Sequence, residues 1–191
     1  TRMYPEVYIS NSLVKMEYAV NFGSASDNVY PKVVIDEGGE LHLSRANSVS
    51  YGLSLNRNVD VVVKNGGCLS SALGGAEPNN YAGLVLEENS FGTLLVENGG
   101  KLKIDKITDK NTKATESRRV DIVFDGGILE MTSGSILTTS FKVPDYHGFT
   151  TRNKGVNIVI PSGGTHIFAA PFRGNGNVVK TGAGQLGIKN G

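Results

Sequence analysis

Three observations predict an all-β fold built as a parallel β-helix, or β-solenoid, of about six rungs. A pattern of alternating apolar residues, a glycine pair and a second alternating run recurs five times in the chain. Valine and isoleucine dominate these runs, as in strands, and no amphipathic helix competes with them. Finally, 25 of the 191 residues are glycine, which allows many sharp turns because glycine adopts positive φ at little cost.

The five copies of the pattern define the elements that we expect. They cover residues 33–43, 61–69, 94–104, 122–131 and 158–168. The expected structural turns are the glycine pairs Gly38 and Gly39, Gly66 and Gly67, Gly99 and Gly100, Gly126 and Gly127, and Gly163 and Gly164. Successive pairs are 28, 33, 27 and 37 residues apart, roughly the length of one solenoid turn. The fourth copy is one residue short before its glycines.

The alternation also predicts which side chains are inside. In the first copy Val33, Ile35, Leu41 and Leu43 should point inward and stack on their counterparts in the next rung. The outward column after the glycine pairs is expected to hold Glu40, Cys68, Lys101, Ile128 and Thr165. These five residues share no chemistry, which favours an ordinary solvated face. His166 falls in a column of leucines, so either it is buried or the register slips and Ile167 lies inside.

Strand spacing alone leaves a second fold open. Short strands separated by turns every 8 to 12 residues are also typical of an antiparallel β-sandwich. The glycine pairs could then close hairpins instead of corners between parallel sheets.

The last part of the chain adds a resemblance. Residues 170–191, APFRGNGNVVKTGAGQLGIKNG, contain a G-x-G, an apolar pair and the core x-K-T-G-x-G-x-L. This segment resembles the passenger-associated β-strand repeat of bacterial autotransporters, and the glycine-pair copies are similar to passenger coils. The resemblance implies a right-handed parallel β-helix that is secreted and displayed on the surface of a Gram-negative bacterium.

The resemblance also sets the expected function. Residues 1–191 would be a single β-solenoid segment of a longer passenger, acting without catalysis as a stalk, an adhesin or a self-associating surface. Its expected partners are a host or neighbouring-cell surface, either protein or glycan, or a second copy of itself. No run of about 18 apolar residues occurs, so direct membrane insertion of this segment is not expected. Open strand edges at its ends predict weak self-association.

Composition argues against several other functions. The formal net charge is +1, which gives no electrostatic signal for nucleic acid. Cys68 is the single cysteine of the sequence, so neither an internal disulfide nor a zinc-binding cysteine pair can form. Residues 182–187 match G-x-G-x-x-G, but too few residues follow for the helix and acidic residue of a dinucleotide site. No cofactor is expected.

The candidate ligand-binding site is a polar loop over residues 105–119. It carries the basic residues Lys106, Lys110, Lys113, Arg118 and Arg119. Loops held by a rigid scaffold often carry function, and paired arginines can bind a carboxylate or phosphate.

A carbohydrate-active β-helix, such as a polysaccharide lyase or hydrolase, is the alternative function. Such enzymes group carboxylates on one outer sheet. Asp60, Asp121 and Asn157 are expected at matching outward places, with Thr93 at the matching place between the two aspartates. Two carboxylates on non-adjacent rungs make a poor catalytic pair.

Overall fold

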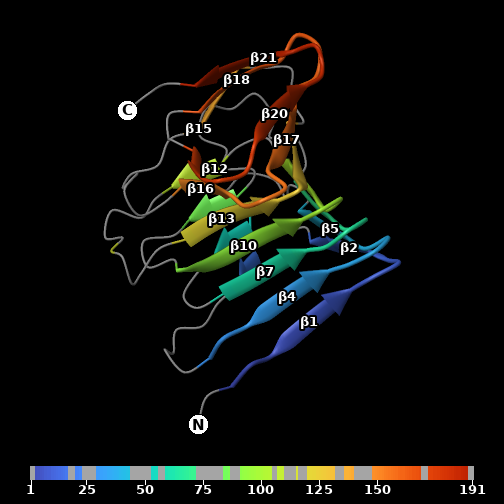
Figure 1. Cartoon of the computed structure of the whole chain (residues 1–191). Helices are drawn as coiled ribbons and strands as arrows, with labels where there is room; N and C mark the ends of the chain where they lie inside the picture. The colour runs from blue at the N-terminus through green and yellow to red at the C-terminus, as the bar shows by residue number, and fades with distance from the viewer. Residues whose placement is uncertain are drawn as a thin grey trace.

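The structure, a computed structural model, describes residues 3–16, 20–22, 29–43, 53–55, 59–71, 84–86, 91–104, 107–109, 115, 120–131, 136–139, 148–168 and 172–188. Within these ranges the chain consists of strands and turns, and the strands form four sheets (Figure 1). The N-terminal and C-terminal strands lie at opposite ends of the molecule. The described ranges contain no helix of the length and hydropathy that a membrane span requires.

Two long sheets hold seven strands each. The first sheet has the order β1 (Glu6–Ile9), β4 (Lys32–Ile35), β7 (Val59–Val63), β10 (Gly92–Glu97), β13 (Val120–Asp125), β16 (Gly148–Thr151) and β19 (Phe172–Gly174). The second has the order β2 (Leu13–Met16), β5 (Glu40–Leu43), β8 (Cys68–Ser71), β11 (Lys101–Ile104), β14 (Gly127–Met131), β17 (Val156–Val159) and β20 (Val178–Thr181).

Two shorter sheets contain the remaining strands. One has the order β12 (Ile107–Asp109), β9 (Leu84–Leu86), β6 (Leu53–Leu55) and β3 (Val20–Phe22). The other has the order β15 (Ile136–Thr139), β18 (Thr165–Phe168) and β21 (Gln185–Ile188).

Every ladder between described strands is parallel, and each joins a strand to the one three places further along the chain. Parallel neighbours need long connections, and here each connection contains the strands of the other sheets. The antiparallel sandwich that the spacing left open is therefore wrong. The fold is all-β, with parallel strands in stacked sheets.

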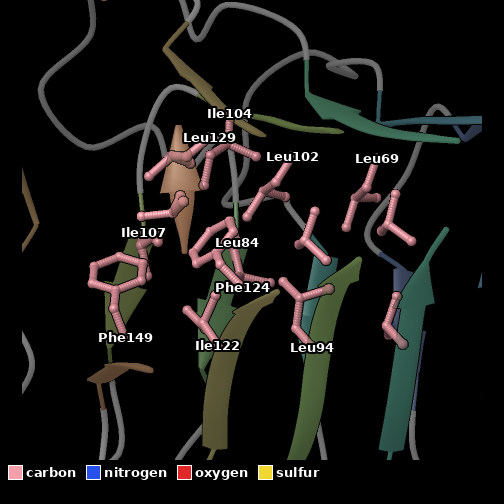
Figure 2. Close-up of a cluster of buried hydrophobic side chains, with 14 of the residues drawn as sticks. Leu69, Leu84, Leu94, Leu102, Ile104, Ile107, Ile122, Phe124, Leu129 and Phe149 are labelled. Atoms are coloured by element: carbon pink, nitrogen blue, oxygen red, sulfur yellow. The ribbon is translucent and has the colours of Figure 1, made fainter. Parts of the chain in front are cut away.

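The interior is apolar, and its residues come from alternate positions of the strands. Figure 2 shows Leu94 and Ile122 of the first sheet pointing toward Leu102 and Leu129 of the second. The inward residues predicted for the first copy, Val33, Ile35, Leu41 and Leu43, are all buried, which confirms that alternation. Each fully buried aliphatic side chain contributes roughly 1.5–3 kcal/mol of transfer free energy.

The corners between the two long sheets are joined by main-chain hydrogen bonds. The amide of Gly38 donates to the Gly66 oxygen, Gly66 to Gly99 and Gly99 to Gly126, each at 3.2 Å, and Gly126 donates to Gly155 at 2.7 Å. All five of these glycines have positive φ. A glycine at this place lets the backbone turn without a Cβ clash, so the corner repeats along the stack.

Each of the long sheets has seven strands, whereas the sequence predicts about six rungs. The additional set is β1 to β3, whose corner carries no glycine pair. Asn11 takes the left-handed conformation there with φ 47°, a conformation that asparagine tolerates better than most residues. Its amide donates to the Glu37 oxygen at 3.0 Å, so Asn11 extends the same corner.

The fifth glycine pair lies at a different corner from the other four, which corrects the sequence alignment. Gly163 and Gly164 follow β17 of the second sheet and precede β18 of a smaller sheet. Gly155 occupies the first corner instead. Consequently Asn157, not Thr165, continues the outward column, since Asn157 pairs with Ile128. Both corners join alternating strands through a glycine turn, so the local pattern alone could not distinguish them.

The segment that resembles the passenger repeat supplies one complete set of strands. Within the described residues 172–188, β19 joins the first sheet, β20 the second, and β21 pairs with β18. The expected loop over residues 105–119 is partly a strand, because β12 pairs with β9 and Ile107 is buried. An apolar residue within the polar segment allowed this pairing.

Candidate functional site

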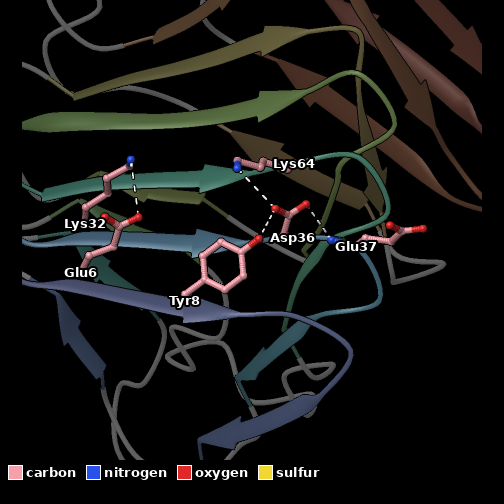
Figure 3. Close-up of polar contacts among 6 residues, drawn as sticks. All are labelled: Glu6, Tyr8, Lys32, Asp36, Glu37 and Lys64. Atoms are coloured by element: carbon pink, nitrogen blue, oxygen red, sulfur yellow. Dashed lines mark hydrogen bonds and ion pairs between the residues drawn. The ribbon is translucent and has the colours of Figure 1, made fainter.

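Polar side chains on the outer face of the first sheet bind one another across strands (Figure 3). The Tyr8 hydroxyl donates to the Asp36 carboxylate, and Lys64 Nζ donates to the same oxygen at 3.3 Å. The hydrogen bond to Asp36 raises the pKa of Tyr8, and the same bond lowers the pKa of Asp36. The hydrogen bond to Asp36 also raises the pKa of Lys64. These groups satisfy one another's charges and hydrogen bonds.

A second cluster, Glu40, His42 and Ser70, lies on the outer face of the second sheet. Ser70 Oγ donates to Glu40 Oε1 at 2.6 Å and lies 2.7 Å from His42 Nδ1. Because the hydroxyl proton goes to the carboxylate, His42 Nδ1 must donate its own proton to Ser70 Oγ. The imidazole therefore cannot deprotonate this hydroxyl, and Ser70 is buried with 3% exposure. This geometry does not activate Ser70 as a nucleophile.

Glu130, on β14, binds two lysines of the adjacent strand β11 on the same outer face. Its carboxylate oxygens are 3.0 Å from Lys101 Nζ and 3.2 Å from Lys103 Nζ. Burial pushes the pKa of Glu130 up, but the hydrogen bonds from both lysines outweigh it, so the pKa is lowered. The bond to Glu130 raises the pKa of Lys101.

Cys68 is half-buried in the same outward column. Burial raises the pKa of its thiol to about 11, and the nearby Glu40 charge adds to the effect. The thiolate is the reactive form of cysteine, so this environment suppresses its nucleophilic reactivity at neutral pH.

The two aspartates considered for catalysis share a column, and Asn157 does not. Thr93 pairs with Asp60 on one side and with Asp121 on the other, as the sequence predicts. Asp60 Oδ1 accepts a hydrogen bond from the Thr93 amide at 3.1 Å. Asn157 lies in the second sheet, so the expected group of three is not assembled.

The sequence-predicted binding loop cannot be placed from this structure. Lys106, Lys110, Lys113, Arg118 and Arg119 all lie outside the described residues. Of the segment 105–119, the structure describes only β12 and residue 115.

A solvent-open cavity of about 380 Å³, which we call the corner notch, lies where the first sheet turns into the second. Its lining residues come from four successive corners of the stack and, in the case of Leu95, from within β10. They are Asn65, Leu95, Glu97, Asn98, Asp125, Arg152 and Lys154.

The corner before Gly126, which contributes Asp125 to the corner notch, differs in length from its neighbours. In the second and third copies, two residues separate the last inward residue from the corner glycine, as in Glu97 and Asn98 before Gly99. Asp125 alone fills this place before Gly126, and the following corner has three residues before Gly155. A Cβ added at Gly126 would be 2.7 Å from Asn98 Oδ1 and 3.0 Å from Lys154 Cβ. The Asn98 and Lys154 corners therefore pack closely over Gly126, where only a glycine fits.

Charged groups of both signs line the corner notch. Glu97 and Asp125 are direct neighbours in adjacent parallel strands, about 4.8 Å apart at the backbone. Asp125 Oδ1 accepts a hydrogen bond from the Lys154 amide at 3.2 Å. Among the described residues, the charged ends of Glu97, Arg152 and Lys154 form no ion pair or hydrogen bond. The Glu97 charge adds to the hydrogen bond that raises the pKa of Lys64, and no direct hydrogen bond from a described residue blocks the Glu97 carboxylate.

The described residues contain no group of three histidine, cysteine, aspartate or glutamate side chains that could hold a metal ion. Comparison with known proteins gives no match to a family model, to a curated protein or to a solved structure.

Proposed function

We propose that this chain is a segment of a right-handed parallel β-helix from an autotransporter-like passenger, displayed on the surface of a Gram-negative cell. In this proposal it acts without catalysis, as a stalk and as an adhesive or self-associating surface. The observation that carries the proposal is the parallel pairing of each strand with the third strand along, over an apolar interior.

The repeat-like C-terminal segment supports the same proposal. Residues 172–188 contribute one strand to each of three sheets, so they continue the stack and do not form a separate unit. In repeat folds each unit is stabilised mainly by its neighbours. Such a stack can therefore be lengthened along one axis, as a surface stalk requires.

The outer faces support a structural role for the charged residues. Tyr8, Asp36 and Lys64 bind one another, and Glu130 binds two lysines. These side chains stabilise neighbouring strands in register. Their hydrogen-bonding capacity is largely used within the sheets.

Surface display tests the proposal directly. Residues 1–191 would be fused between a cleavable signal peptide and the membrane barrel of a laboratory autotransporter, in a Gram-negative host. We expect intact cells to bind antibody against the segment, and to attach to host-cell monolayers or to one another more than cells with the barrel alone. A segment that stays in the periplasm would refute display. A displayed segment without attachment or aggregation would refute adhesion.

Substitution of one crowded and one uncrowded glycine tests whether display depends on the stacked fold. A Cβ on Gly100 would be 2.9 Å from the Lys64 carbonyl oxygen and closer still to that of Val63, whereas on Gly187 its nearest neighbour would be Ile167 Cγ1 at 3.5 Å. We expect Gly100→Ala to destabilise the fold by about 2–4 kcal/mol and Gly187→Ala to change stability by less than about 0.5 kcal/mol. Whole-cell protease digestion should then remove the Gly100→Ala segment first. Equal resistance of the two variants would contradict the stacked-corner fold.

The carbohydrate-active alternative retains one supporting observation, the adjacent carboxylates of Glu97 and Asp125 in the corner notch. Mass spectrometry of uronate-containing and neutral oligosaccharides incubated with the purified chain distinguishes the two proposals. Intact oligosaccharides support the non-catalytic function, and cleavage that is lost in Glu97→Gln would establish the alternative.

A further inference from the structure

We propose that the corner notch binds one acidic unit of a saccharide chain, with the carboxylates and amides of the notch on the sugar hydroxyls and Arg152 with Lys154 on the sugar carboxylate. This inference deepens the proposed function by naming a ligand class, and it rests on that function for its biological setting. The binding itself is a property of the folded chain and can be tested without display.

Two successive corners that border the corner notch differ in length from the corners before Gly38, Gly66 and Gly99, which sets this place apart from them. The deletion before Gly126 occurs in one copy of the corner, and the three-residue corner that follows carries both cations. Strand register is nevertheless maintained on both sides, since β10 pairs with β13 and β13 with β16. The corner notch is therefore confined to the surface, and Phe124 of the neighbouring interior is fully buried.

The charge pattern excludes several ligand classes. A divalent cation would meet Arg152 and Lys154 beside the two carboxylates. A nucleic acid or another dense polyanion would be repelled by Glu97 and Asp125. An apolar ligand finds Leu95 as the single apolar residue of the lining. What remains is a polar ligand with many hydroxyls and well-separated negative charges.

Hydroxyl-rich chemistry uses the whole lining. Carboxylate oxygens accept hydrogen bonds from hydroxyls, and amides can both accept and donate. Glu97, Asp125, Asn65 and Asn98 present such groups within the notch. The guanidinium of Arg152 can bind a sugar carboxylate through two parallel hydrogen bonds. A small zwitterion would leave the amides of Asn65 and Asn98 unused.

The binding test uses the purified 191-residue chain and a hyaluronan tetrasaccharide, in which uronate units alternate with neutral N-acetylhexosamines. Its fully methyl-esterified form, which has the same hydroxyls but no charge, is the ligand control. By isothermal titration calorimetry we expect a Kd of about 1 mM for the acid. We expect binding of the ester to be about tenfold weaker. No binding of the acid to folded protein, or equal binding of the ester, would overturn the proposal.

Two charge-removing variants locate the binding. Arg152→Gln and Glu97→Gln should each weaken binding about tenfold. The matched control is Lys103→Gln, which removes one charge from the outer face of the second sheet, where Lys103 binds Glu130, and should leave the affinity unchanged. An equal loss in Lys103→Gln would show non-specific charge attraction and refute the site.

A filling variant tests the cavity itself. Inserting one asparagine between Asp125 and Gly126 gives this corner the two-residue length of the corners before Gly38, Gly66 and Gly99. The insertion should abolish binding because it displaces Asp125 from the notch, and circular dichroism checks that the variant folds. A folded insertion variant that binds normally would refute the notch, and if the insertion does not fold, the two charge-removing variants decide. Failure of display with binding retained would refute only the proposed surface function, whereas display without binding would refute only the notch.

Discussion

His166 places an ionisable ring within the apolar interior. It is 2% exposed, whereas Ile167 is only half-buried, so the register slip considered from the sequence does not occur. The His166 ring centroid lies 4.3 Å from that of Phe168, and His166 pairs in register with Leu186. Burial lowers the pKa of His166 to about 4, because the charged imidazolium loses its hydration there.

This lowered pKa predicts a specific pH dependence of stability. The unfolded chain takes up a proton at His166 near pH 6.5, whereas the folded chain does so only near pH 4. The histidine contribution is therefore complete above pH 6.5 and is lost as the pH falls toward 4, by about 3 kcal/mol in total. Urea unfolding followed by circular dichroism at several pH values measures this change.

Two variants isolate the His166 contribution. His166→Leu should flatten the profile between pH 4.5 and 6.5, and Gly187→Ala, which adds no titratable group on the neighbouring strand β21, should leave the profile as in wild type. Asp36 and Glu130, whose pKa values are lowered, lose their contributions only at more acidic pH, below about 4.5. A flat wild-type profile from pH 7 to 4.5 would contradict the burial of a neutral His166.

At the scale of one element, β8 contains two adjacent serines in opposite environments. Ser70 faces outward and binds Glu40 and His42. Ser71 occupies an inward place opposite Leu43, and its buried Oγ has no hydrogen-bond partner among the described residues. A buried hydroxyl without a partner costs roughly 1–3 kcal/mol.

The two serines therefore predict opposite effects of the same substitution. Ser71→Ala should stabilise the protein by about 1 kcal/mol, because it removes a desolvated hydroxyl. Ser70→Ala should destabilise it by about 1 kcal/mol, because Glu40 and His42 both lose a partner. Each variant acts as the control for the other in thermal and urea unfolding. A loss of stability in both variants would show that Ser71 has a hydrogen-bond partner in solution.

The strands could be predicted from the sequence because alternation and glycine pairs are local signals. Val33 and Ile35 are buried as the period of two requires. The glycine-pair pattern does not predict β1 to β3, because Asn11 and not a glycine stands at their corner. The sequence pattern places the fifth pair, at Gly163, at the wrong corner, because two corners of the stack share one local pattern. Strand direction was also open, since it depends on pairing between distant residues.

The sequence shows the shortened corner before Gly126 but does not predict the corner notch. The missing residue before Gly126 is visible in the sequence, but a gap in an alignment does not show which side chains surround it. Arg152 lines the corner notch because β16 pairs with β13 in the first sheet. The sequence pattern does not predict this, because it places Gly163 and not Gly155 at the corner. The segment 105–119 is predicted as a binding loop from its basic residues alone. Ile107 within this segment is buried in a strand.

At the scale of the whole molecule, the two ends of the stack differ in chemistry. At the β1 end, Val7 pairs with the buried Val33 but is itself 49% exposed, so an apolar inward column lies open. At the β20 end, the inward Val178 is 37% exposed, but the next inward residue, Lys180, pairs with the buried Ile158, so a charge stands beside the apolar residue. The Lys180 ammonium donates to the Gly182 oxygen at 2.6 Å. An inward-pointing charge is a known protection of sheet edges.

This asymmetry predicts that the 191-residue chain associates weakly through its β1 end. The exposed edge of β1 offers backbone hydrogen bonds and apolar contacts to a second copy, whereas Lys180 opposes the same contact at the β20 end. Sedimentation equilibrium should show a rising average mass between about 10 μM and 1 mM. Val7→Lys should suppress this rise, and Val179→Lys, at a residue of similar exposure (52%) on β20, should not. A monomer at every concentration, or equal suppression by both variants, would show that the open apolar column at β1 does not drive association.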